Sequence, residues 1–217
     1  MAGATEVTIE MGTKKVFACA LDWPGWCRSG KTEQLALESL SAYAARYRDA
    51  ARAAGVAFPS TAGGSFAVVE WLDGDGGTDF GVPGQVAAVD REPLTAAQAE
   101  RLAKLVRGAW SVLDAVAATA PETLRKGPRG GGRDRDKLIA HVVESEASYG
   151  RMIDLKLNVP APGDQAAIEA NRDALAAAIA AGRRPPENPR RWPARYAARR
   201  IAWHALDHAW EMEDRSV

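Results

Sequence analysis

Residues 199–215, RRIAWHALDHAWEMEDR, contain two of the three histidines of this chain of 217 residues. His204 and His208 are four positions apart, and residues at this spacing lie on one face of an α-helix, about one turn from each other. Ile201 and Met212 extend this face in both directions, so it is expected to point into a core of packed helices. The stretch therefore predicts a helix whose two imidazoles can reach a single metal ion.

The third histidine, His141, lies in another predicted helix, residues 136–157. It belongs to a stripe of residues at helical spacing, namely Leu138, Ser145, Tyr149 and Met152. When such stripes face one another in a bundle, three neutral imidazoles from two helices form a site for one divalent transition metal with an open coordination position. The alternative is a buried, hydrogen-bonded histidine cluster without a metal. Burying several imidazoles without a metal or another partner is costly, so we favour the metal site.

Long helical segments fill the second half of the chain. Apolar periodicity and helix-start signals predict helices over about 95–120, 136–157, 164–181 and 194–214. A loop rich in glycine and arginine, residues 121–135, separates the first two, and the proline-rich residues 183–193 precede the last. Helices of about 20 residues span about 30 Å, which predicts an all-α four-helix bundle over residues 91–217.

The first half, residues 1–90, has a different pattern. Short runs of β-favouring residues predict strands at 6–10, 15–21 and 66–72, and Gly12 between the first two predicts a hairpin. Thr32 is suited to cap a helix that extends to about residue 54. We therefore expect an α+β domain over residues 1–90, with a short antiparallel sheet and a helix, followed by the helical domain.

Charge is balanced over the whole chain, with 28 Lys and Arg and 28 Asp and Glu residues. Residues 1–90 carry 7 basic and 11 acidic residues, and residues 91–217 carry 21 and 17, which supports two domains. A balanced chain has no overall attraction to nucleic acid or anionic membranes, so neither is expected as a partner. Because the sequence shows neither a signal peptide nor a membrane helix, we expect a cytoplasmic protein in which Cys19 and Cys27 stay reduced.

Residues 25–32, GWCRSGKT, match the phosphate-binding loop pattern G-x4-G-K-T and lie between a predicted strand and a predicted helix. In such a loop, Lys31 would contact the terminal phosphates and Thr32 a magnesium ion. The first 90 residues, however, with short hairpin-linked strands, leave little room for the parallel sheet of a nucleotide-binding fold. Bulky Trp26 also lies within the loop.

The longer stretch 21–47, LDWPGWCRSGKTEQLALESLSAYAARY, resembles the HicB-like domain. The resemblance covers about residues 6–72 and implies that Gly30 is a turn residue and that Thr32 caps a helix. We favour it over the phosphate loop. It leaves three roles open for the first domain: a substrate lid, a dimerisation surface for a homodimer, or a remnant scaffold.

Two glutamates follow the histidines at helical spacing. Glu144 lies three residues after His141, and Glu211 lies three residues after His208. A carboxylate near a metal can be a fourth ligand, can orient an imidazole or can act as a general base, so both are candidate catalytic residues. The alternative for each is an ordinary salt bridge or a solvated position. Asp207 lies off the histidine face and is expected to pair with an arginine or to contact solvent.

The segments KLIAHVVESEASY (137–149) and RRIAWHALDHAWEMEDR (199–215) resemble the DinB-like (YfiT-like) metalloproteins. The resemblance covers about residues 94–215 and implies that His141, His204 and His208 bind zinc, nickel or a similar ion. Members of this family with known chemistry transfer low-molecular-weight thiols, such as bacillithiol or mycothiol, or isomerise small molecules with a thiol cofactor. The ending after His208 differs from the Gly-Gln or Arg-rich ending common in the family, so the substrate cannot be carried over.

These features favour a metal-dependent thiol transferase of the mycothiol type, or a hydrolase, that acts on a small molecule. Arg129, Arg133 and Arg135 in the glycine-rich loop are candidates to hold a carboxylate of a thiol cofactor, and a solvated basic loop is the alternative. The rival function is a non-catalytic metal-binding protein whose HicB-like domain binds a protein partner.

Overall fold

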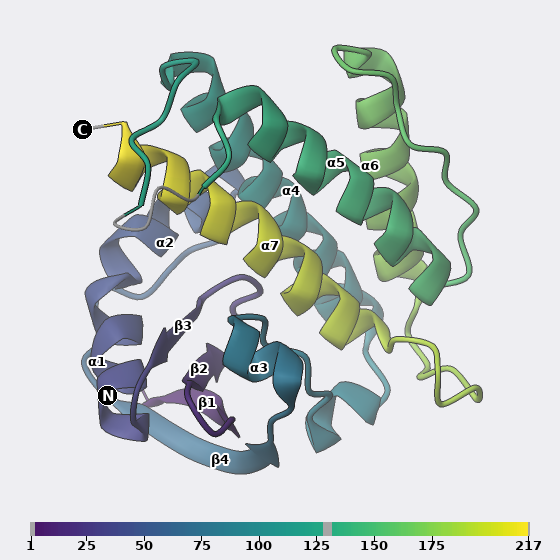
Figure 1. The fold of residues 1–217 in the computed structure, drawn as a ribbon. Coiled ribbons are helices and arrows are strands. Elements are labelled where there is room, and N and C mark those ends of the chain that lie inside the picture. The colour runs from purple at the N-terminus through teal and green to yellow at the C-terminus, as the bar shows by residue number, and fades with distance from the viewer. Residues whose placement is uncertain (1–2, 128–131, 217) are drawn as a thin grey trace.

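A computed structural model describes residues 3–127 and 132–216, which form a four-stranded sheet and seven α-helices. The strands and the shorter helices lie in the first part of the chain, and four long helices make up most of the second part (Figure 1). The protein is therefore α+β overall, as the sequence predicts.

The sheet has the strand order β3-β2-β1-β4. Strands β1 (Thr5–Met11), β2 (Val16–Ala20) and β4 (Phe66–Asp73) correspond to the three predicted strands, and β1 and β2 form the expected hairpin. Strand β3 (Cys27–Gly30) pairs antiparallel with β2. The sequence does not predict β3, because its four residues CRSG include little that favours a strand.

The sheet is mixed, so the expectation of an antiparallel sheet is wrong at one edge, where β4 runs parallel to β1. Two helices, α1 (Glu33–Ala42) and α2 (Ala44–Ala53), lie between β3 and β4 in the chain. Such a helical crossover allows neighbouring strands to run in the same direction, whereas a short hairpin does not. The short helix α3 (Gly76–Phe80) and a 3-10 turn (Ala88–Arg91) follow β4.

Helix α1 begins as predicted, because the Thr32 side chain accepts a hydrogen bond from the backbone N–H of Leu35 at 3.2 Å. The single helix predicted up to about residue 54 is two helices that meet at Tyr43. The ring of Tyr43 packs against that of Trp210, with 5.0 Å between the ring centroids. The break therefore lies where the first half of the chain contacts the C-terminal helix.

The four long helices are α4 (Ala96–Thr119), α5 (Arg135–Met152), α6 (Gln165–Ala181) and α7 (Ala194–Arg215), close to the predicted ranges. Helix α5 ends five residues before its predicted end. Asp154 has a left-handed φ of 62°, and the N–H of Leu155 donates back to the carbonyl of Gly150 at 2.9 Å, which closes the helix.

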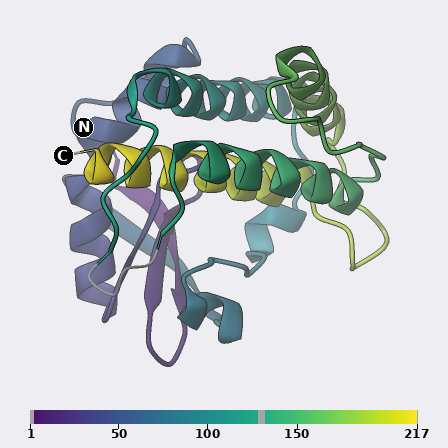
Figure 2. The same ribbon diagram turned by 45° about the horizontal axis from the view of Figure 1, so that its top comes forward.

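Helix α4 packs along α7 and α6, and α5 packs along α7. Figure 2 shows α7 between the sheet and α4. On the sheet side, Trp203 of α7 packs with three residues of β2 and β3, namely Phe17, Cys19 and Cys27. The C-terminal helix is therefore in contact with both parts of the chain.

One apolar core includes residues from both sides of residue 90, among them Val7, Ile9, Trp26, Tyr47, Leu105, Leu113, Leu206 and Trp210. Helices α2 and α4 approach so closely that a Cβ at Gly108 would lie 2.2 Å from the carbonyl oxygen of Ala50. The described residues thus share a core across the predicted boundary. That 1–90 and 91–217 are separate domains stays a prediction.

The backbone of residues 25–32 is used by the sheet rather than by a phosphate loop. Within this stretch, β3 pairs with β2 through four register pairs, from Cys27 opposite Cys19 to Gly30 opposite Val16. A phosphate loop needs free N–H groups that curl around the ligand, which a strand in a ladder does not offer. The geometry therefore argues against the phosphate-loop alternative.

Cys19 and Cys27 are bonded as a disulfide, so the expectation that both stay reduced is wrong. Their spacing along the chain fits no metal motif, and only the pairing of β2 with β3 brings the two sulfurs together. None of the helices in the described ranges has the length and apolar character needed to cross a membrane.

Candidate metal centre

Three histidine nitrogens meet between α5 and α7. The Nε2 atom of His204 lies 3.3 Å from that of His141 and 3.2 Å from that of His208, and one ligand nitrogen from each residue lies within 4.8 Å of the other two. Two nitrogens bound about 2.0 Å from a tetrahedral zinc ion would be about 3.3 Å apart. The structure therefore brings together the three predicted ligands, at a spacing that suits one ion.

The direction of the two helices explains this meeting. His141 lies near the start of α5, whereas His204 and His208 lie in the second half of α7. Figure 1 shows α5 starting beside the C-terminal half of α7 and running in the opposite direction. The antiparallel arrangement brings the ligands to the same level.

Burial favours the neutral form of His204 and His141. His204 is only 6% exposed, and burial lowers its pKa to about 2, helped by the positive charge that His208 or His141 would carry. Burial also lowers the pKa of His141, and the nearby charge of Arg133 adds to the effect. Neutral imidazole is the form that binds a metal. His204 and His141 can therefore bind one at pH values below the usual pKa of histidine.

Hydrogen bonding among the histidines alone does not satisfy the site well. The Nε2 of His204 faces two other Nε2 atoms, but a ring nitrogen has either one proton or one lone pair. It can serve both neighbours only by sharing its one proton or its one lone pair between them. Its Nδ1 is buried and has no hydrogen-bond partner within the described ranges, whether or not an ion is bound at Nε2. The three nitrogens thus fit a shared ion better than a metal-free cluster.

Glu211 supports one of the ligands. Its Oε2 accepts a hydrogen bond from Nδ1 of His208 at 2.9 Å, and its Oε1 accepts one from Nη1 of Arg215 at 2.6 Å. The contact with His208 lowers the pKa of Glu211. A proton held on Nδ1 leaves the Nε2 lone pair of His208 directed at the other histidines. The geometry is that of a residue that orients an imidazole; its catalytic role stays a prediction.

Glu144 is exposed on α5. Its negative charge is near enough to oppose the lowering of the pKa of His141. Within the described part of the chain its carboxylate forms no hydrogen bond to a histidine, so its catalytic role also stays a prediction. Asp207 pairs with Arg28 of β3 at 2.9 Å, in agreement with the expected arginine partner.

The three candidate arginines differ in position. Arg129 lies outside the described residues. Arg133 is exposed, and its charge acts on both His141 and His204. Arg135 is turned to other partners, because it donates to Asp136 at 2.7 Å and to the carbonyl of Ala120 at 3.1 Å. Of the two that the structure describes, Arg133 is the one near the histidines.

Sequence reasoning missed two arginines on the histidine face of α7. Residues 200, 204, 208, 211 and 215 follow one another at steps of three or four, and the first and last are Arg200 and Arg215. Nη2 of Arg200 donates to Oη of Tyr149 at 3.4 Å, and the Tyr149 ring packs against the ring of His204. The same helical spacing that identified the histidines could have found both arginines.

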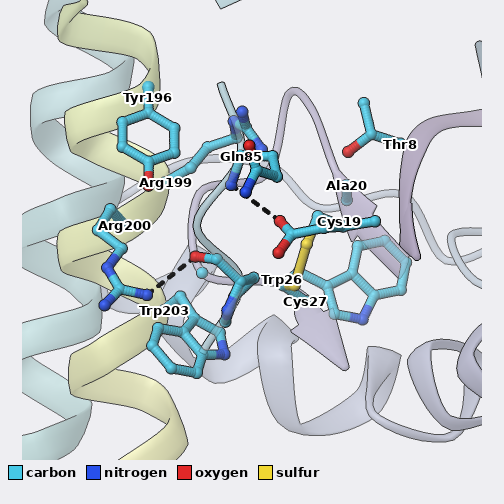
Figure 3. Close-up of a pocket in the computed structure, with 13 residues that line it drawn as sticks. Thr8, Cys19, Ala20, Trp26, Cys27, Gln85, Tyr196, Arg199, Arg200 and Trp203 are labelled. Carbon is cyan, nitrogen blue, oxygen red and sulfur yellow. Dashed lines mark hydrogen bonds between the residues drawn. A yellow bond between two sulfur atoms is a disulfide. The ribbon is translucent and has the colours of Figure 1, made fainter. Parts of the chain in front are cut away.

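Two of the pockets lined by residues of α7 bear on the site. The one in Figure 3, between α7 and the sheet, is lined by both cysteines, Arg200 and Trp203, but its volume of about 20 Å³ has room for about one water molecule. A larger, open pocket of about 300 Å³ lies along the C-terminal half of α7, and one of its lining residues is Glu211, the partner of His208. Its other lining residues are Arg28, Asp207, Trp210, Asp214 and Arg215. The open pocket is the one that suits a small molecule.

No family model matches this chain, and comparisons with curated proteins and with solved structures likewise found no match.

Proposed function

We propose that this chain is a DinB-like metalloprotein, with the long helices forming its four-helix bundle, that binds one zinc or nickel ion and acts on a small molecule. The observation that carries the proposal is the approach of the three Nε2 atoms to one another, with 3.3 and 3.2 Å between neighbours. His141, His204 and His208 would hold the ion. A divalent ion with three neutral ligands offers an open position where a bound water or thiol loses its proton more readily.

The surrounding residues would prepare the site and hold the substrate. Glu211 keeps His208 in the tautomer that can bind the ion, and Arg215 fixes Glu211 in turn. The open pocket beside Glu211 gives a small molecule a place near the histidines. A thiol substrate of the mycothiol type, as the resemblance implies, has polar groups that the arginines Arg28, Arg133 and Arg215 can receive.

Metal analysis tests the binding step. We expect close to one transition metal ion per chain in protein purified without chelator, and its loss in His141→Ala, His204→Ala and His208→Ala, since each removes one of three ligands. Ser148→Ala, an exposed change on α5, is the matched control and should keep the metal. Elemental analysis that finds no metal, or full retention in all three histidine variants, contradicts the proposal.

Turnover tests the catalytic step. The metal-loaded protein should accelerate the reaction of a low-molecular-weight thiol, with mycothiol first, with a small electrophile, and a chelator should abolish the acceleration. A metal-loaded protein with no rate above background for any thiol or ester tested favours the rival, a metal-binding protein without turnover.

A further inference from the structure

The disulfide between Cys19 and Cys27 lies where the sheet meets α7. It joins opposite residues of β2 and of β3, the strand at one edge of the sheet, and the two residues are 7% and 4% exposed. Trp203 of α7 belongs to the same buried apolar cluster as both cysteines, and all three line the pocket in Figure 3. The next residue along α7 is His204, whose ring centre lies 6.1 Å from that of Trp203. Trp203 therefore links the disulfide to one of the candidate metal ligands.

Arg28 forms a second link between the disulfide and α7. It directly follows Cys27 on β3, and its Nη1 donates to Oδ1 of Asp207 at 2.9 Å. Asp207 is the residue before His208 on α7. The guanidinium of Arg28 also lies over the ring of Trp210, with 5.5 Å to the ring centre. The position of β3 therefore affects the turn of α7 that carries His208.

Reduction of the bond would disturb the packing around it. A disulfide holds its two sulfur atoms at bonding distance, whereas heavy atoms that are not bonded prefer a separation of about 3.5 to 4 Å. The pocket that both cysteines line has a volume of about 20 Å³, which is room for about one water molecule. Because protein interiors are closely packed, two separate thiols would displace neighbouring groups. Trp203 and strand β3 are the parts that we expect to move.

The fold has other means of holding β3 in place. The ladder between β2 and β3 contains four register pairs, and helix α1 packs on β3. The two cysteines are only eight positions apart, and cross-linking a short loop stabilises a protein less than cross-linking a long one. We therefore expect reduction to leave the protein folded and to act locally, on β3 and on the part of α7 that it contacts.

We propose that Cys19 and Cys27 form a reversible redox site that controls metal affinity at the histidines. The inference rests on the proposed metal binding and adds its regulation. In the oxidised form, the bond holds β3 and Arg28 against α7 and fixes the packing of Trp203. In the reduced form, this support is looser, the ligands on α7 are less well ordered, and the ion is bound more weakly.

The reductant in this scheme is a low-molecular-weight dithiol. One of its thiolates attacks a cysteine sulfur, which breaks the protein S–S bond and forms a mixed disulfide, and its second sulfur then displaces the other cysteine. The dithiol leaves as a cyclic disulfide, and its two electrons and two protons pass to Cys19 and Cys27, which become thiols. Because both cysteines are almost fully buried, the attack requires local opening, for which the edge strand β3 is suited.

Zinc affinity in the two redox states tests the proposal. The oxidised protein is compared, by competition with a chromogenic chelator, with protein that has been reduced with dithiothreitol and freed of it under nitrogen. A thiol assay should find two thiols per chain after reduction. We expect zinc to bind about tenfold more weakly to the reduced form, since the groups that support metal ligands contribute tenfold or more to affinity. Cys19→Ala/Cys27→Ala should bind zinc as weakly, and the same treatment should leave its affinity unchanged.

The link through Arg28 has its own variant. Arg28→Met should weaken zinc binding by the oxidised protein and reduce the difference between the two redox states, because it removes a contact of β3 with α7. Arg46→Met is the matched control. Arg46 also forms ion pairs with α7, at Glu213 and Asp214, but it belongs to α2 and is not next to a cysteine. This variant should retain the full difference.

Equal or tighter zinc binding in the reduced form overturns the inference, and so does a bond that dithiothreitol cannot reduce in the folded protein. A protein that binds no zinc in either form counts instead against the proposed metal binding. Amide hydrogen exchange in α7 of the metal-free protein then still tests the coupling. Faster exchange around residues 204–208 after reduction supports it, and unchanged exchange contradicts it.

Discussion

Between α4, α5 and α6, Arg172 pairs with Glu146 and Asp114, whereas between α5 and α7 three histidines face one another. The Nε atom of Arg172 lies 3.2 Å from Glu146, and its Nη1 lies 2.8 and 3.0 Å from the two oxygens of Asp114. Glu146 and Arg172 are 3% and 4% exposed. Both groups contain buried polar side chains, but only the first contains opposite charges that pair with each other, although Oε1 of Glu146 has no hydrogen-bond partner among the described residues.

This difference identifies the histidine cluster as the one that needs a bound cation or an added proton. A buried pair of opposite charges needs no further ion, because each charge offsets the other, and it serves the packing of helices. Three groups of the same kind, each with a lone pair to offer, are incomplete until a cation or a proton joins them. A polar residue on an inward helix face does not separate the two cases, because Glu146 and Arg172 are as buried as His204.

The largest expected effect is in the ion-pair cluster. Arg172→Met should lower the free energy of unfolding by about 3 kcal/mol or more, because it leaves Glu146 buried without its partner. Burial already raises the pKa of Glu146, so the loss should shrink at low pH, where the carboxyl group becomes neutral. Urea unfolding monitored by circular dichroism, at neutral pH and at low pH, measures the loss of stability under both conditions.

Arg107→Met is the control for this change. Arg107 forms an exposed pair with Asp173 at 2.8 Å, so its loss should cost at most about 1 kcal/mol. Similar costs for the two arginine variants would mean that the pair of Arg172 with Glu146 is not a buried ion pair.

A smaller effect is expected at the histidines. Glu211→Gln should weaken metal affinity about ten- to a hundredfold, because it replaces the carboxylate that holds Nδ1 of His208. Competition with a chromogenic chelator gives the affinity. Glu213→Gln, which changes a carboxylate of the same helix that pairs with Arg46, should leave it unchanged. Equal affinities in all three proteins would show that Glu211 only forms a surface ion pair.

The smallest effect concerns pH in chelator-treated protein. The folded-state pKa of His204, lowered to about 2, is far below that of the unfolded chain, so the unfolded state binds the extra proton. The stability that neutral His204 contributes is fully present at pH values above the unfolded-state pKa of about 6.5. Below that pH, the free energy of unfolding falls by about 1.4 kcal/mol per pH unit. Unfolding curves between pH 7 and pH 5 measure this slope. His204→Leu should reduce this slope. An unchanged slope in that variant would contradict the assignment of the pH dependence to His204.

The helical half of the molecule could be predicted well from the sequence, because its signals are local. Thr95 and the apolar period place α4, and the spacing of His204 and His208 places two ligands on one face. The third ligand, His141, required only the further idea that inward stripes meet. The residues that neighbour the site could not be predicted from the sequence, because contacts such as that of Arg200 with Tyr149 depend on how α5 lies against α7.

The sheet was harder to predict because its pairing is not local. Strand β3 is specified by β2 beside it rather than by its own residues, and the parallel pairing of β4 with β1 depends on the helices between them. The disulfide between Cys19 and Cys27 has the same origin. Sequence spacing gave no sign that the two cysteines are ladder partners.

The position of the ligands on two different helices gives a bound ion a mechanical effect. An ion shared by His141 and His204 would be a cross-link between residues 63 positions apart, and it would close the loop that contains α6 and the proline-rich residues 183–193. This cross-link would reduce the conformational entropy of the unfolded chain and hold α5 against α7. Amide hydrogen exchange in α5 would then slow on metal addition, while exchange in α4, which is held by packing on both α6 and α7, would change little.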